Sequence, residues 1–189
     1  PHAPQIPARV QRAIAENNRG EQFFARGEYR PALEHFNAAL TAAESVEDED
    51  AIAANLINLS VVQQRIGDAT GAVASVERVL NERNLRFPER RVAEAALRRA
   101  LLSFDAGDAA AAQRWTQTAE HRCTQTCALN PKLLALRGYL AIAQGDGSAA
   151  ERAGQETLAL AEAAEDREER ANGLRLIGIG ALLQGEATR

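Results

Sequence analysis

The sequence predicts an all-α protein built as an α-solenoid, a stack of antiparallel helical hairpins. Three observations predict this fold: a Gly followed by an acidic residue recurs at nearly constant spacing, Ala is the commonest residue, and aromatic residues make up only 4% of the chain. Small residues suit helices that approach each other closely, whereas strands favour β-branched and aromatic side chains. A chain of 189 residues can hold one ordinary domain or about four to five small repeats.

The repeated unit is marked by its Gly-acid dipeptide, which occurs at 27–28, 67–68, 107–108, 145–146 and 185–186. The spacing is 40 residues in every interval except the third, where it is 38. Gly adopts the left-handed conformation that ends a helix, because it has no Cβ to oppose it. The acid can then accept from free N–H groups at the start of the next helix. Each dipeptide therefore predicts the turn between the two helices of a hairpin.

The apolar periodicity between these turns predicts helices at 8–26, 29–45, 51–66, 69–82, 89–106, 109–124, 131–144, 148–164 and 167–184. The prolines agree with these positions. Pro31 lies in the first turn of its helix, while Pro88 and Pro131 open theirs, where a missing N–H costs nothing. Residues 1–7 are Pro-rich and are expected to form an extended tail. Residues 8–189 are expected to form a single domain of about four full repeats and a final helix.

The order of residue types in the first unit resembles the tetratricopeptide repeat. It runs small residue, aromatic, Gly, aromatic, Ala-Leu, aromatic, Ala-Leu, and is carried by Gly20, Phe23, Gly27, Tyr29, Ala32, Leu33, Phe36, Ala39 and Leu40. The resemblance covers about residues 10–189 and is weakest in the third unit. The repeat of this chain is nearer 40 residues long, whereas the family's repeat has ~34. The resemblance implies a right-handed superhelix that binds proteins or peptides.

The resemblance also implies a binding groove, because the first helix of each hairpin lines the concave side in that family. Its register places partner-binding residues at Asn18, Phe24, Asn58, Val61, Arg65, Arg98, Leu101, Tyr139 and Ile142. This set is an apolar strip edged by Asn and Arg, which suits an amphipathic helix or an extended peptide. Leu97 and Leu136 share the same register, but we expect them to pack between hairpins.

The groove departs from the family's clamp for the carboxylate of a chaperone tail. Asn58 and Arg98 match that clamp, while Asn17, Glu21 and Glu94 occupy its other three positions. Two acids would repel a carboxylate. The sequence therefore predicts a ligand other than a chaperone tail.

Composition and motifs argue against several other functions. The net charge of −4 and pI near 5.5 disfavour a nucleic-acid partner, and no apolar run approaches the ~20 residues of a transmembrane helix. The three His are far apart, and the HExxH, GxSxG and GxxxxGK[ST] motifs are absent from the sequence. We therefore expect no enzyme activity, no cofactor and no resident metal.

Cys123 and Cys127 lie four residues apart at the joint between the third and fourth units. Three interpretations are open. The pair can form a local disulfide, which needs an oxidising compartment. The thiols can stay reduced and pack as small hydrophobes. With His121, they can bind a metal, although a lone C-x₃-C motif indicates this weakly.

Together these features predict a binding scaffold that helps to assemble or localise a bacterial envelope or secretion machine. A bacterial source is suggested by the Ala excess and by 21 Arg against the single Lys132. The Cys pair suggests the periplasm or the inner face of the outer membrane, and the missing initial Met leaves room for a lost lipid anchor. The alternatives are a cytoplasmic scaffold, the sensor module of a larger regulator, or a metal-handling protein that uses the Cys pair.

The last predicted helix is more apolar than a solvent-facing cap requires. Its large apolar residues are Leu174, Ile177, Leu182 and Leu183. Because the end of a solenoid normally shows a polar face, we expect a further packed segment or an oligomer contact there.

Overall fold

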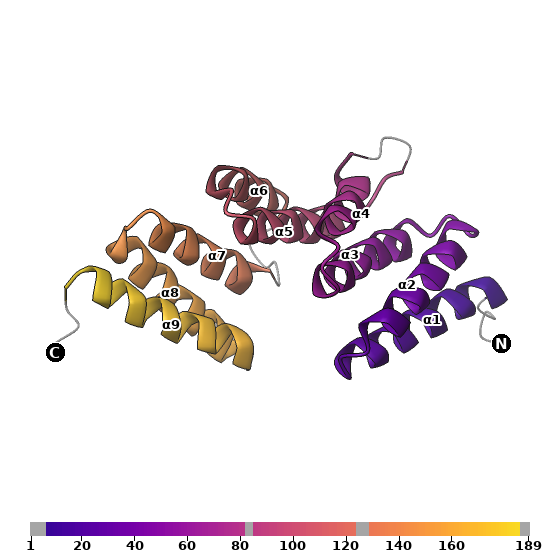
Figure 1. Ribbon diagram of the computed structural model, residues 1–189, viewed down its shortest axis with the longest axis horizontal. Coiled ribbons are helices and arrows are strands. Elements are labelled where there is room, and N and C mark those ends of the chain that lie inside the picture. Colours follow the sequence, from indigo (N-terminus) through magenta and orange to yellow (C-terminus); the bar gives the residue numbers. More distant parts are fainter. Residues whose placement is uncertain (1–6, 82–84, 124–128, 186–189) are drawn as a thin grey trace, which may run out of the picture. The chain divides into compact units, whose positions relative to one another are not determined.

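The computed structural model describes residues 7–81, 85–123 and 129–185, and each regular element in those ranges is an α-helix (Figure 1). The helices are α1 (Ala8–Ala25), α2 (Tyr29–Glu44), α3 (Glu49–Arg65), α4 (Ala69–Asn81), α5 (Glu89–Asp105), α6 (Ala109–Arg122), α7 (Asn130–Ala143), α8 (Gly147–Ala163) and α9 (Arg167–Leu183). Every predicted helix is present, with ends within two residues of the prediction. The all-α class is confirmed.

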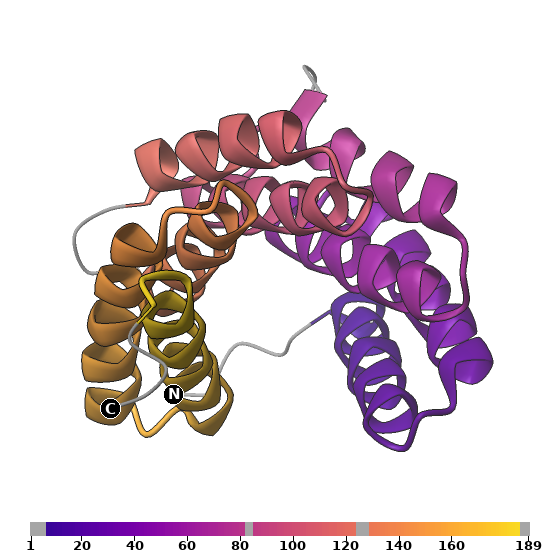
Figure 2. The same cartoon turned by 60° about the vertical axis from the view of Figure 1, so that its left-hand side comes forward.

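The chain divides into two compact units, residues 1–95 and 96–189. In the first unit α1 packs on α2, α2 on α3, and α3 on α4; in the second, α6 packs on α7, α7 on α8, and α8 on α9. The pairs α1–α2 and α8–α9 can be followed in both views (Figures 1 and 2). Packing of each helix on the next one along the chain is the arrangement of an α-solenoid of helical hairpins. The prediction that 8–189 is a single domain stays a prediction.

The Gly of each repeated dipeptide has the left-handed backbone that the sequence predicts. The φ angle is +76° at Gly27 and +86° at Gly67, and it lies between +75° and +79° at the other three. A Cβ would oppose this conformation. The pattern therefore identifies the turn inside each hairpin correctly.

The acids after these glycines behave in two ways. The side chains of Asp108 and Asp146 each accept a hydrogen bond of 2.9 Å from a backbone N–H in the first turn of the next helix. The predicted cap at Glu28 is wrong, because the Glu28 carboxylate accepts no hydrogen bond from a backbone N–H of α2. It accepts one from Arg26 Nε at 2.6 Å instead. Asp is a favoured N-cap residue, whereas Glu, with a side chain one CH₂ longer, is not.

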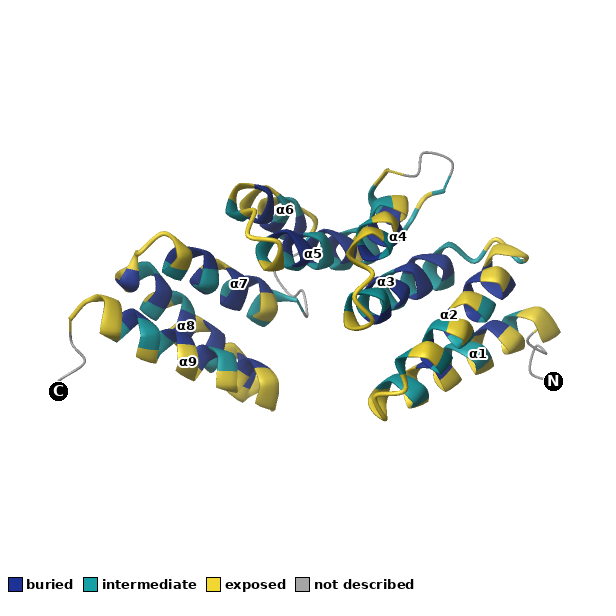
Figure 3. Cartoon of the chain, in the orientation of Figure 1, coloured by how far each residue is buried: buried dark blue, intermediate teal, exposed yellow. Residues whose placement is uncertain are grey.

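The core is built from small residues on facing helices, and buried positions lie where helices face one another (Figure 3). Gly20 of α1 shows why the first unit needs a small residue. A Cβ added there would lie 2.7 Å from the ring of Phe36, which is only 2% exposed. Gly20 thus lets the Phe36 ring lie directly against the backbone of α1.

In the second unit, glycines of α8 and α9 oppose each other twice. Gly154 faces Gly173, and Gly147 faces Gly180; the two glycines on each helix are seven residues apart. A Cβ on Gly154 would lie 2.8 Å from the carbonyl oxygen of Gly173. The two backbones therefore touch without side chains between them.

None of the helices that the structure describes has the length and apolar composition of a membrane span.

Candidate functional site

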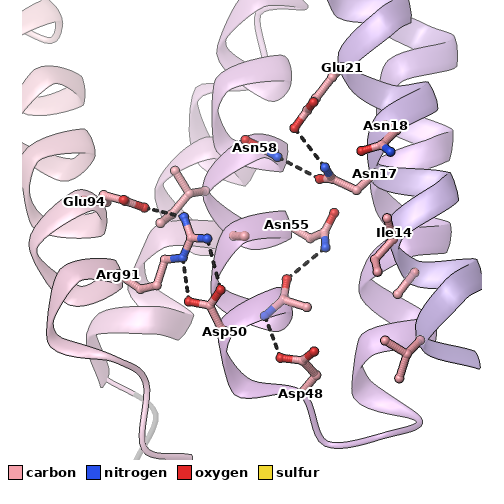
Figure 4. Close-up of a pocket in the computed structure, with 15 residues that line it drawn as sticks. Ile14, Asn17, Asn18, Glu21, Asp48, Asp50, Asn55, Asn58, Arg91 and Glu94 are labelled. Carbon is pink, nitrogen blue, oxygen red and sulfur yellow. Dashed lines mark hydrogen bonds and ion pairs between the residues drawn. The ribbon is translucent and has the colours of Figure 1, made fainter. Parts of the chain in front are cut away.

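A pocket of about 310 Å³ opens in the first unit between α1, α3 and the start of α5 (Figure 4). Its lining residues recur every three or four positions, so each helix presents one face to the pocket. They are Val10, Ala13, Ile14, Asn17, Asn18 and Glu21 of α1; Asp48, Asp50, Ala51, Ala54, Asn55, Ile57 and Asn58 at or within α3; and Arg91 and Glu94 of α5. These are the first helices of successive hairpins, which the resemblance to the tetratricopeptide repeat predicts on the concave side.

A chain of amide hydrogen bonds joins α3 to α1 along one wall of the pocket. Asn58 Nδ2 donates to Asn17 Oδ1 at 3.1 Å, and Asn17 Nδ2 donates to Glu21 Oε1 at 2.8 Å. Asn17 and Asn58 are half-buried, and Glu21 is exposed. The bonds fix the orientation of both amides, which makes this wall a preformed polar surface.

The opposite wall is held by Arg91, whose planar guanidinium binds two carboxylates. Its Nε and Nη2 donate to the two oxygens of Asp50 at 2.9 and 3.2 Å, and its Nη1 donates to Glu94 Oε2 at 2.7 Å. Arg90 adds a bond of 2.6 Å to Asp50. Hydrogen bonding to Arg91 is the main reason that the pKa of Asp50 lies below its usual value, and the bond to Asp50 raises the pKa of Arg91. Asp50 and Arg91 are therefore both charged in the folded protein.

Asn55 lies between these walls and is 2% exposed. Its Nδ2 donates to the Ala51 carbonyl at 2.8 Å, whereas its Oδ1 has no hydrogen-bond partner among the residues that the structure describes. Figure 4 shows this amide side chain reaching from α3 toward α1. A buried acceptor without a partner costs about 1–3 kcal/mol. The pocket therefore holds one acceptor that a ligand can satisfy.

The predicted groove residues of the first unit fall partly in this pocket. Asn18 and Asn58 line it. Val61 and Arg65 lie further along α3 and are not part of its lining. Phe24 is half-buried and packs on Tyr29, with ring centroids 5.5 Å apart.

The other predicted groove residues lie in the second unit, on α5 and α7. Arg98, Leu101, Tyr139 and Ile142 are all half-buried there. The Tyr139 hydroxyl donates to Asn172 Oδ1 at 3.0 Å, and its ring centroid lies 6.3 Å from that of Phe104. The partner-binding role of these four residues stays a prediction. Leu97 and Leu136 are buried, at 4% and 2% exposure, as expected for residues that pack between helices.

Among the polar residues of the pocket lining, sequence reasoning missed four: Asp48, Asp50, Asn55 and Arg91. Asn55 precedes Asn58 by one helical turn, so the i, i+3 spacing could have placed both on one face. The contact of Asp50 with Arg91 joins residues 41 positions apart, close to one repeat period. That pairing could have been found by comparing acidic and basic residues at equivalent positions of neighbouring units.

The predicted pair of Cys123 and Cys127 lies partly outside the described residues. Cys123 follows the last residue of α6, and Cys127 is not described, so the disulfide stays a prediction. Within 7–81, 85–123 and 129–185, no group of three or more His, Cys, Asp or Glu side chains is placed to hold a metal ion.

Comparison with known proteins identifies the repeat in the first part of the chain. Residues 11–81 match the family model described as "Tetratricopeptide repeat". The crystal structure of MamA protein superposes with a TM-score of 0.59 at 17% identity and covers 94% of this chain and 85% of its own. Residues 11–81 carry tetratricopeptide repeats, and the described chain shares the fold of the MamA structure. This fold typically serves as a non-enzymatic scaffold for protein–protein interaction.

A second similar structure is PilF of Pseudomonas aeruginosa, with a TM-score of 0.55 and 18% identity. The match covers 83% of this chain and 63% of the PilF chain. None of the curated proteins matches the chain. At these identities the two structures show the shared fold alone.

Proposed function

We propose that this protein binds a segment of a partner protein in the pocket of α1, α3 and α5. The observation that carries the proposal is the buried Oδ1 of Asn55, an acceptor in the pocket lining that has no partner among the described residues. Ligand pockets combine apolar walls with a few placed polar groups that fix orientation. Here Ile14 and Ile57 provide apolar surface, and the amides provide polar groups for an extended or helical segment.

Site-specific photo-cross-linking in cells of the native organism tests this proposal. A photoreactive amino acid replaces Ile14, which lines the pocket and is 49% exposed, or Glu34, which is exposed on α2 outside the pocket lining. We expect a cross-linked partner from position 14 and none from position 34. Equal cross-linking from both positions, or from position 34 alone, would contradict the proposed site.

We further propose that the scaffold acts in the bacterial envelope, in the assembly or localisation of a surface or secretion machine. The support is the spacing of Cys123 and Cys127, which suits a local disulfide in an oxidising compartment. Thiol titration of denatured protein from the native organism is the test. We expect no free thiol; two free thiols would favour the cytoplasmic alternative.

The exposed face of α9 supports a proposal of self-association. Leu174 and Leu182 are 58% and 59% exposed and lie within about 80° of each other around the helix, and exposed apolar residues gathered on one helix face mark an interface. Light scattering over a range of concentrations should find a dimer that the double change Leu174→Glu and Leu182→Glu abolishes. The control Leu160→Glu, at an exposed position of α8, should leave the dimer intact. A monomer at every concentration would refute this proposal.

A further inference from the structure

We propose that the pocket of α1, α3 and α5 recognises a lysine or arginine side chain of the partner segment, whose cationic group donates to Asn55 Oδ1. This inference rests on the proposed function of the same pocket and adds the chemistry of the ligand. It depends on the charge of the walls, on which polar groups are already bonded, and on the apolar surface beside them.

The pocket walls carry an excess of negative charge. Four carboxylates line it, those of Glu21, Asp48, Asp50 and Glu94, against the single guanidinium of Arg91. Arg90 binds Asp50 from outside the lining, which still leaves two negative charges in excess. Figure 4 shows Glu21 at one end of the pocket and Asp48 at the other, with Asn55 between them. A cation at Asn55 would therefore be attracted from both sides, and an anion would be repelled.

Most of the donor groups in the pocket already bond to protein oxygens, whereas one buried acceptor does not. The amide nitrogens of Asn17, Asn55 and Asn58 and the guanidinium of Arg91 all donate to protein oxygens. Asn55 Oδ1 is the buried side-chain acceptor that has no partner among the described residues, and only a donor can satisfy it. Ammonium and guanidinium groups carry several donors and no acceptor. They match this wall, whereas a carboxylate, which has no donor, does not.

The apolar surface suits the rest of such a side chain. Val10, Ala13 and Ile14 of α1 and Ile57 of α3 line the same pocket. Lys and Arg bury their aliphatic stems along apolar surface while the charged end meets polar groups. A volume of about 310 Å³ lies at the small end of ligand pockets, which span about 300–1,000 Å³. It therefore fits a single large side chain.

Selection from a random-peptide library against the full chain tests the inference, followed by affinity measurement by fluorescence polarisation. Three variants are compared with the wild type: Asn55→Leu, Glu21→Gln, and the control Glu34→Gln on α2. Asn55→Leu removes the unpartnered oxygen at similar volume, so the fold should be retained or stabilised. Glu21 is exposed, so its neutral replacement should leave folding intact.

We expect the selected peptides to share a Lys or Arg, whose replacement by norleucine or citrulline weakens binding by about tenfold or more. Asn55→Leu should weaken binding similarly while the melting temperature holds or rises, and Glu21→Gln should weaken it by about twofold to fivefold. Glu34→Gln should change nothing. Lys and Arg peptides compared at one position show which cation is preferred.

Two other results separate this inference from the function that it builds on. Peptides that share an acidic or neutral residue, yet lose affinity in Asn55→Leu, would overturn the basic ligand and keep the site. Selected peptides whose affinity is unchanged in both Asn55→Leu and Glu21→Gln would overturn the site as well, as would a selection that enriches no peptide.

Discussion

Replacing Gly173 of α9 by Ala should destabilise the second unit, whereas the same change at Gly178 should stabilise it. A Cβ on Gly173 would lie 2.9 Å from the carbonyl oxygen of Gly154 and 2.9 Å from the backbone nitrogen of Leu158. These are backbone atoms, so α8 and α9 must move apart to relieve the contact. A Cβ on Gly178, on the exposed side of the same helix, meets no atom of the described structure within 4 Å.

The size of the difference follows from two effects. Ala is favoured over Gly in a helix interior by about 0.5–1 kcal/mol, and this gain applies at both positions. Overpacking costs about 1–3 kcal/mol and applies only at Gly173. The two variants should therefore differ by about 1–3 kcal/mol, with Gly178→Ala the more stable. In a chain of this length, a change of 1 kcal/mol in the free energy of unfolding shifts the melting temperature by about 2–4 °C.

Thermal unfolding followed by circular dichroism measures this difference. Dilute protein is needed, because Gly178 lies on the face of α9 for which we propose self-association. If Gly173→Ala and Gly178→Ala melt together above the wild type, the close approach of α8 and α9 at glycine would be refuted.

Two further predictions concern a buried carboxyl and the caps. Burial raises the pKa of Glu169, although a bond from Asn172 opposes this, so the folded state favours the protonated form. The contribution of protonated Glu169 to the stability of the folded protein is complete below the unfolded pKa of about 4.3. It is lost as pH rises through the folded pKa. Glu169→Gln should therefore raise the melting temperature at neutral pH and leave it unchanged below about pH 4; an unchanged value at neutral pH would contradict the raised pKa. Asp108→Ala should cost about 0.5–2 kcal/mol in denaturant unfolding, because the cap of α6 is lost. Glu28→Ala, which removes no cap, should cost less than about 0.5 kcal/mol, and equal losses would refute the assignment of these caps.

The helices could be predicted because each hairpin carries its own local stop and start signals. Gly107 ends one helix and Asp108 begins the next within two residues, and the same pair recurs at each turn except where Glu replaces Asp. The turns between hairpins carry a weaker signal. Glu47 and Glu165 have φ angles of 54° and 56° there without being Gly. Because non-Gly residues rarely adopt this conformation, sequence alone did not identify it.

The pocket could be predicted only in part, because it depends on contacts between repeats. The concave register put Asn58 on the helix face that lines the pocket, since one helix face follows from spacing within a helix. The role of Asn55 depends on which atoms lie around it: its oxygen is unpartnered because α1 presents Ile14 and Asn17 rather than a donor directed at it. Whether this oxygen has a partner among the described residues is decided by the side chains of three helices together.

Amide hydrogen exchange of the full chain, with and without the tightest peptide from the library, tests the central claim most directly. The claim is that the faces of α1, α3 and the start of α5 form the binding site. We expect the peptide to slow exchange in 8–25, 49–65 and 89–95, and to leave α8 and α9 unchanged. Protection confined to helices outside these three ranges would contradict the claim, because the peptide would then bind elsewhere on the chain.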